Sequence, residues 1–222
     1  MSTPASAKPR PRPHQDRSLR TAERVLDAAR SLLTRLPYAQ INTRGIAAEA
    51  GLSVGALYRF FPDRQSILGG VAADHRRQLN ALVNDEIATL LSDMWQRGTF
   101  DAALVLGTTV DLYLSYLDAH PDYRALCFGR DFREVMTRPG RLGRNGLAAI
   151  LITVALWRMQ IPESPEFDRM LGVGSEAGER LIAFAYEQPT REQRDRVIAE
   201  LKKMLSAYLG PALAVPKGSR KG

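Results

Sequence analysis

The chain has 222 residues, of which 45% are hydrophobic and 25% are charged, values typical of a globular protein with a buried core. A single cysteine, Cys127, excludes a disulfide framework, and the longest apolar run, residues 147–157, is far shorter than the roughly 20 residues of a membrane span. The N-terminus is polar and Pro/Arg-rich without an apolar segment behind it, so we expect no signal peptide and a soluble cytoplasmic protein.

The formal net charge of +7 is distributed unevenly along the chain. Residues 1–64 contain 11 Lys and Arg residues against 5 Asp and Glu residues, so this first quarter of the chain carries +6 of the total. A basic segment next to a nearly neutral remainder is typical of a protein with a phosphate-rich partner. Composition alone is equally consistent with a solvated basic tail.

Residues 1–17 are rich in proline and arginine, lack an apolar pattern, and are expected to be disordered. Apolar side chains then recur at three- and four-residue steps from Leu19 to Leu36, which predicts an amphipathic helix. Pro37 cannot continue an α-helix and is expected to end it.

Two short helices are expected next, over residues 44–50 and about 54–60. Thr43 and Ser53 are the expected N-caps, and Gly51 is expected to form the turn because it adopts a positive φ without steric cost. From residue 64 to residue 210 the pattern is helical throughout, with predicted helices over 64–96, 100–119, 121–136, 142–160, 164–187 and 191–209.

These elements predict an all-α fold of about nine helices in two domains. The expected boundaries are 18–64 for a DNA-binding domain and 65–210 for a second helical domain, with a disordered tail over 211–222. The first domain is expected to contain a helix-turn-helix, because two short apolar-faced helices flank Gly51 and the small Ala47 allows the helices to approach closely. A plain helical hairpin is the alternative.

The second short helix has small residues at its start, from Ser53 to Ala56, and an aromatic and basic end. A recognition helix enters the major groove with its N-terminal residues against the base edges, so small side chains there allow close approach to DNA. Tyr58 and Arg59 are expected to reach the flanking backbone, and Arg59 is also able to read a guanine. Core packing is the alternative for Tyr58 and Phe60.

Residues 18–71 resemble the N-terminal domain of the TetR family of transcriptional repressors, most specifically in the stretch TRGIAAEAGLSVGALYRFF. The resemblance implies a homodimer in which three N-terminal helices bind a palindromic operator in double-stranded DNA. It also implies that about six further helices form an effector pocket and a dimer interface, and that an effector releases the DNA. The DNA-contacting positions that it implies are Thr43, Arg44, Ser53, Val54, Gly55, Ala56, Tyr58, Arg59, Phe60 and Arg64.

One position departs from the family pattern, because Pro37 stands where a glycine is usual. The loop 37–42 is therefore expected to run differently, which leaves DNA contacts from Tyr38 and Gln40 open. The arginines of residues 10–20 are expected either to enter an adjacent minor groove or to form a solvated tail.

The effector pocket is expected among the helices between residues 64 and 160, whose apolar character suggests a small hydrophobic or aromatic effector. Core packing is the alternative for each candidate lining residue: Trp95, Thr109, Tyr113, Tyr116, Phe128 and Trp157. Dimer contacts are expected from the last two helices, with intrachain packing as the alternative. The candidate interface residues are Leu181, Phe184, Ala185, Leu201, Leu205 and Tyr208.

No catalytic set, cofactor site or metal site is predicted, because His14, His75 and His120 are scattered and Cys127 has no obvious base partner. We therefore expect a DNA-binding transcriptional regulator and not an enzyme, most simply a repressor that a ligand releases from its operator. The alternative is a DNA-binding architectural or cell-division factor of the same fold that has no small-molecule inducer.

Overall fold

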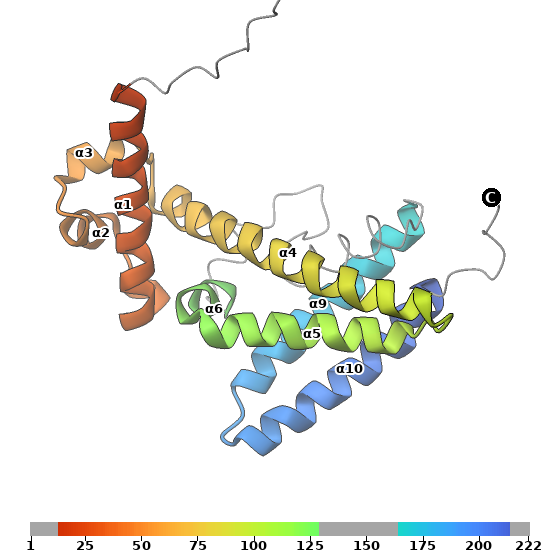
Figure 1. Cartoon of the computed structure of the whole chain (residues 1–222). Helices are drawn as coiled ribbons and strands as arrows, with labels where there is room; N and C mark the ends of the chain where they lie inside the picture. The colour runs from red at the N-terminus through yellow and green to blue at the C-terminus, as the bar shows by residue number, and fades with distance from the viewer. Residues whose placement is uncertain (1–12, 129–163, 214–222) are drawn as a thin grey trace, which may run out of the picture. The chain divides into compact units, whose positions relative to one another are not determined.

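The structure is a computed structural model that describes residues 13–128 and 164–213 (Figure 1). Regular secondary structure in these two ranges is entirely helical, as the predicted all-α class requires. None of the helices described there is both long enough and apolar enough to cross a membrane. The chain divides into two compact units, residues 1–71 and residues 72–222.

The first unit combines three helices, a short 3-10 helix and the start of a fourth helix: α1 (Pro13–Arg35), η1 (Tyr38–Gln40), α2 (Thr43–Glu49), α3 (Val54–Tyr58) and α4 (Arg64–Gln96). Apolar side chains from all four α-helices are buried in it: Val25, Ala29, Leu33, Ile46, Leu57, Ile67 and Leu68. The unit ends at Val71 and not at the predicted position 64, because the first two turns of α4 belong to this core.

Helix α1 begins at Pro13, within the stretch 1–17 that the sequence predicts to be disordered. Proline suits the first position of a helix, since its fixed φ is already helical and the amide hydrogen that it lacks would have no partner there. The prediction is therefore corrected for residues 13–17, and residues 1–12 lie outside the described residues.

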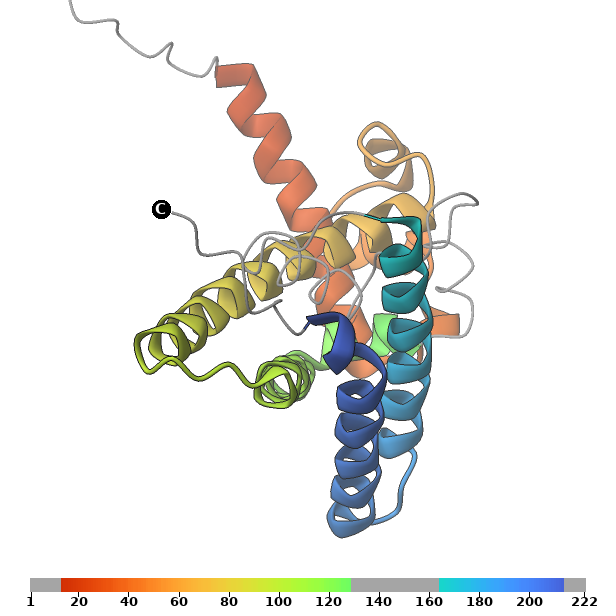
Figure 2. The same cartoon turned by 90° about the vertical axis from the view of Figure 1, so that its right-hand side faces the viewer.

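The second unit contains the remainder of α4 together with α5 (Ala102–Ala119), α6 (Pro121–Phe128), α9 (Pro165–Tyr186) and α10 (Arg191–Leu213). Helices α9 and α10 run side by side in both views, and α5 packs against α10 (Figures 1 and 2). Side chains of α4, α5, α9 and α10 form one apolar cluster whose fully buried members include Ile87, Leu117, Ile182, Leu201 and Leu205. The predicted helix 142–160 and the end of the predicted helix 121–136 lie outside the described residues.

Helix α10 continues through Pro211 to Leu213, although the sequence predicts an end at 209 and a disordered tail from 211. A proline inside a helix removes one backbone hydrogen bond. Leu213 is buried in the apolar cluster, and burial of a leucine side chain is worth about 1.5–3 kcal/mol, which offsets that loss.

Candidate nucleic-acid interface

The turn between α2 and α3 has the geometry of a helix-turn-helix. Gly51 has φ of 64°, and its N–H donates to the Ala48 carbonyl at 3.1 Å while the Leu52 N–H donates to the Ala47 carbonyl at 2.9 Å. This pair of hydrogen bonds is the Schellman motif, which ends a helix with a residue in the left-handed region. The predicted role of Gly51 is confirmed.

Each short helix is capped at its start by a side chain. The Ser53 hydroxyl accepts a hydrogen bond from the Ala56 N–H at 3.1 Å, as predicted. The cap of α2 is Asn42 and not Thr43, because the Asn42 side-chain oxygen accepts from the Gly45 N–H at 2.9 Å. Thr43 is instead the first helical residue, which leaves its hydroxyl available for another partner.

The hydroxyl of Thr43 meets that of Tyr58 at 3.2 Å, so the start of α2 is joined to the end of α3. The Tyr58 side chain is 48% exposed, which excludes the core-packing alternative for this residue. Thr43 and Tyr58, two of the candidates for DNA contact, therefore lie together.

The remaining face of α3 is exposed, and its side chains are short. Ser53, Val54 and Gly55 are exposed, and a methyl group added at Gly55 would meet nothing within 4 Å. Leu57 on the opposite face is fully buried and fixes the helix to the core. Ala56 and Phe60 are partly buried, so Phe60 contributes to packing as well as to the edge of this face.

The arginines of the first unit fall into two groups. Arg24 donates to the Ala50 carbonyl at 2.6 Å, and Arg35 pairs with Glu49 at 2.6 Å, so these two side chains hold α2 against α1. Hydrogen bonds from Ser31 and Arg35 lower the pKa of Glu49. The second group is exposed and makes no ion pair with another described residue: Arg17, Arg20, Arg44 and Arg59.

Arg64, the predicted phosphate ligand, has two partners inside the unit. Its Nη1 donates to the Ile41 carbonyl at 3.0 Å, and its guanidinium lies 4.6 Å from the centre of the Tyr38 ring. Tyr38 is buried and belongs to η1, in the loop where Pro37 departs from the family pattern. DNA contacts were left open for two residues of this loop. The ring of Tyr38 is in contact with the Arg64 guanidinium, whereas Gln40 is exposed.

The candidate pocket residues occupy different environments. Thr109 is buried and donates to the Val105 carbonyl at 2.8 Å, while Tyr113 is buried with its hydroxyl 3.7 Å from Cys127 Sγ. Burial raises the pKa of Tyr113 well above its ordinary value. Phe128 packs against Tyr186, with 5.3 Å between the ring centres.

The two tryptophans proposed for the pocket differ in what the structure says of them. Trp95 is 48% exposed in the last turn of α4, which does not fit the lining of an enclosed site, and Trp157 lies outside the described residues.

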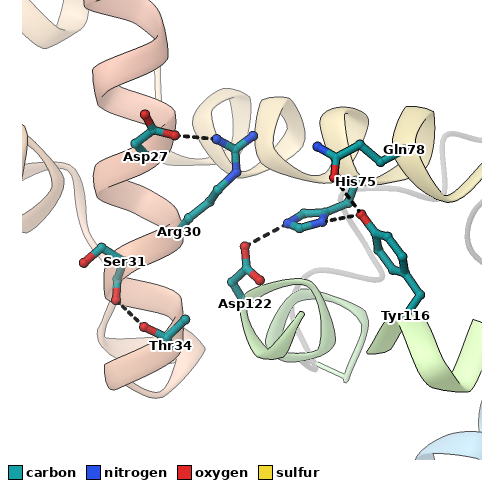
Figure 3. Close-up of polar contacts among 8 residues, drawn as sticks. All are labelled: Asp27, Arg30, Ser31, Thr34, His75, Gln78, Tyr116 and Asp122. Atoms are coloured by element: carbon teal, nitrogen blue, oxygen red, sulfur yellow. Dashed lines mark hydrogen bonds and ion pairs between the residues drawn. The ribbon is translucent and has the colours of Figure 1, made fainter. Parts of the chain in front are cut away.

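The second unit contains a buried polar cluster around His75 that is absent from the sequence predictions (Figure 3). His75 from α4 lies between the Tyr116 hydroxyl, 2.8 Å from Nδ1, and the Asp122 carboxylate, 2.8 Å from Nε2. The Tyr116 hydroxyl also donates to Gln78 Oε1 at 3.2 Å, and the ring of Tyr123 stacks on His75. The cluster thus joins α4, α5 and α6.

The sequence does contain one signal for this cluster. His75 occupies the buried stripe of α4, four residues after Val71 and four before Leu79, where an unpartnered polar group would be costly. A buried histidine on an apolar stripe implies polar partners from other helices. Within residues 13–128 and 164–213, no group of three or more His, Cys, Asp or Glu side chains is arranged to hold a metal ion.

The candidate interface residues on α9 and α10 separate into two sets. Ala185, Leu201 and Leu205 are fully buried within the protomer, so the intrachain alternative holds for them and they are not available to a partner. Phe184 and Tyr208 are more than 40% exposed. The apolar stripe of α10 packs against α9 and α5. Its leucines therefore contribute to intrachain packing and not to the dimer contact that the sequence suggested.

The comparison with known proteins places residues 25–71 in the family described as bacterial regulatory proteins, tetR family. An uncharacterised HTH-type transcriptional regulator from Bacillus subtilis (strain 168), YvkB, is 28% identical over 79 residues. That alignment covers 36% of this chain and spans less than half, 42%, of the curated relative.

Solved structures share the fold over most of the chain. A TetR-family regulator from Streptomyces coelicolor matches with a TM-score of 0.61 and 22% identity over 86% of this chain and 99% of its own. RolR in complex with resorcinol gives a TM-score of 0.58 at 15% identity, over 94% of this chain and 98% of RolR. Residues 25–71 thus match the tetR family of bacterial regulatory proteins, and the chain shares the fold of solved TetR-family regulators.

Proposed function

We propose that this regulator is a homodimeric repressor in the cytoplasm that binds a palindromic operator and is released by a small hydrophobic or aromatic molecule. The observation that carries the DNA-binding part is the exposed face of α3, on which small residues precede Tyr58 and Arg59. This face is held by a capped start, a glycine turn and a buried Leu57, so it is rigid before DNA arrives.

Each proposed contact has a definite kind of partner on DNA. Ser53 and Gly55 allow the start of α3 to approach the base edges, and Ala56 is suited to contact with a thymine methyl group. Arg44 and Arg59 are exposed without an ion-pair partner among the described residues, so both are available to phosphate or guanine. Thr43 and Tyr58 form the edge between them, where we propose backbone contacts.

The homodimer is proposed because one helix-turn-helix reads few base pairs and a two-fold dimer reads two half-sites. The exposed apolar side chains Val173, Phe184 and Tyr208 on α9 and α10 support an interface on these helices. The effector part rests on two observations. Tyr113, Tyr116 and Thr109 are buried in the second unit, where the two tyrosines contribute aromatic rings, and RolR, which shares the fold, was solved with the small aromatic molecule resorcinol.

The test begins with selection of duplexes from a random library by the purified full-length protein. The enriched duplex is then titrated by fluorescence anisotropy at two salt concentrations, with unrelated DNA as competitor. We expect competitor-resistant binding with two protomers or a multiple of two on each palindromic site. Failure to enrich any sequence, with a steep salt dependence on all duplexes, would contradict the proposal and favour the architectural alternative.

The effector is tested on the same complex. A panel of small aromatic and aliphatic molecules is added to the bound duplex, and we expect at least one apolar compound to release it. A panel that releases nothing, with operator binding intact, would remove the effector from the proposal and leave the DNA-binding part standing.

A further inference from the structure

Arg64 stands at an unusual place for a cation. It is the first residue of α4, and the first turn of that helix contains no acidic residue. The N-terminus of a helix carries the positive end of the helix dipole, where a positive side chain is unfavourable unless it is held elsewhere. A phosphate of DNA is one possible partner, and an acceptor within the protein is another.

The structure gives Arg64 acceptors within the protein. The Nη1 atom donates to the Ile41 carbonyl at 3.0 Å, and the guanidinium lies 4.6 Å from the Tyr38 ring centre, within the range of a cation–π interaction. Arg64 itself is partly buried, whereas Arg44 and Arg59 are exposed. The guanidinium would have to leave both contacts before it could serve as a free phosphate ligand.

The two partners of Arg64 precede α2 directly. Tyr38 lies in η1, and Ile41 is followed by Asn42, whose side chain caps α2. Ile41 is almost fully buried, so its side chain is held by packing while its carbonyl is held by Arg64. A side chain that fixes the Ile41 carbonyl therefore fixes the direction in which α2 starts, and with it the positions of Thr43 and Arg44.

We propose that Arg64 is a positioning residue that locks the loop 37–42 onto the start of α4 and so sets α2 for DNA binding, and is not a phosphate ligand. The expected effect of Arg64 on DNA affinity rests on the proposed DNA-binding function. The lock itself, between Arg64, Tyr38 and Ile41, exists in the free protein and is open to measurement without DNA.

The DNA experiment uses the duplex enriched by the wild-type protein and the variants Arg64→Gln, Arg64→Lys and Tyr38→Leu. We expect each to weaken binding on the order of tenfold without changing the salt dependence, and Arg64→Gln with Tyr38→Leu to be no worse than either alone. Lysine keeps the charge but lacks the planar guanidinium that lies over the ring, so it should not rescue binding.

A phosphate ligand would behave differently. Arg64→Gln would then reduce the slope of log affinity against log salt by about 0.9, Arg64→Lys would bind nearly as wild type, and Tyr38→Leu would have no effect. That combination would overturn the proposal. Arg97→Gln removes an arginine charge from a surface pair with Asp93 outside the first unit and serves as the matched control.

Thermal unfolding without DNA separates this proposal from the proposed function. We expect Arg64→Gln and Tyr38→Leu to lower the unfolding temperature and to be coupled in a double-mutant cycle, while Arg97→Gln has little effect. If no duplex is enriched, the proposed function fails but this cycle still decides whether the lock exists. Independent effects of the two variants, or no effect of Arg64→Gln, would show that it does not.

Discussion

His75 Nε2 lies 2.8 Å from Asp122 Oδ2, and both side chains are more than 90% buried, so α4 and α6 are joined by a polar pair inside the second unit. A pair of this kind is costly to break, because removal of one partner leaves the other buried without compensation. The Tyr116 hydroxyl lies 2.8 Å from Nδ1, so both ring nitrogens of His75 have a hydrogen-bond partner. The pair therefore specifies how α6 is seated on α4.

Asp122→Asn is expected to destabilise the protein by about 2–4 kcal/mol at neutral pH, because it removes the charged acceptor of a buried hydrogen bond. Burial alone would raise the pKa of the Asp122 carboxyl, but the hydrogen bond and charge of His75 outweigh it and lower the pKa below the ordinary value. Chemical denaturation of both proteins at a series of pH values measures the difference.

The sign of the pH dependence follows from that lowered pKa. A carboxyl whose pKa is lower in the folded state stabilises the protein above its unfolded pKa of about 3.9, and this stabilisation is lost as pH falls through the folded value. The wild type should therefore lose its advantage over Asp122→Asn below about pH 4. An advantage that stays constant down to pH 3 would show that the pair does not set the pKa of Asp122.

Gly55→Ala is expected to separate stability from DNA binding. A methyl group at Gly55 meets open space in the free protein, and Ala is favoured over Gly in a helix, so unfolding should cost about 0.4–1 kcal/mol more. The same methyl group would lie against DNA if the small face of α3 enters the groove. Operator affinity should therefore fall, on the order of tenfold or more, while the unfolding temperature rises.

Gly51→Ala provides the contrasting control. Gly51 has φ of 64°, a conformation that costs an L-residue about 1–2 kcal/mol, and the added methyl group would approach the Arg24 side chain at 3.4 Å. This variant should lose stability instead of gaining it. Equal DNA affinity for Gly55→Ala and wild type would place the face of α3 away from the bases.

Arg59→Ala is expected to weaken operator binding by about 1–3 kcal/mol, since Arg59 is an exposed cation on the proposed interface. Its effect on stability should be small, because Arg59 makes no ion pair with a described residue. Anisotropy titrations at physiological salt give the affinity. A loss of less than a few tenths of a kcal/mol would remove Arg59 from the proposed contacts.

Phe184→Asp is expected to dissociate the proposed dimer while the protomer stays folded, because the Phe184 side chain is 43% exposed. Sedimentation velocity should show a monomer, and operator affinity should fall with it. Leu205→Asp is the comparison, since that leucine is fully buried and its replacement should unfold the protein. A dimer that persists in Phe184→Asp would move the interface away from this part of α9.

Local sequence signals predicted much of the fold. Helix α4 was predicted over 64–96 and runs from Arg64 to Gln96, and the Asp63 carboxylate at its start accepts from the Ser66 N–H at 2.6 Å. Gly51 and Ser53 were likewise assigned correctly, because a positive φ and an N-cap are properties of single residues in short segments.

The features that were missed depend on tertiary packing. Nothing near Arg64 in the sequence shows that its guanidinium turns back to Tyr38, 26 residues earlier. His75 and Asp122 are 47 residues apart and meet only because α4, α5 and α6 pack together. The burial of Leu201 and Leu205 within the protomer, which removes them from an interface, follows from the packing of α10 on α9 and α5.

The most direct test of the account is the affinity of the wild-type protein for its enriched duplex against a scrambled duplex of equal length, at physiological salt. We predict that the enriched duplex binds at least about 10³-fold tighter, with two protomers or a multiple of two on each site. Equal affinity for both duplexes, with the same steep loss of binding as salt increases, would contradict sequence-specific recognition by the α3 face.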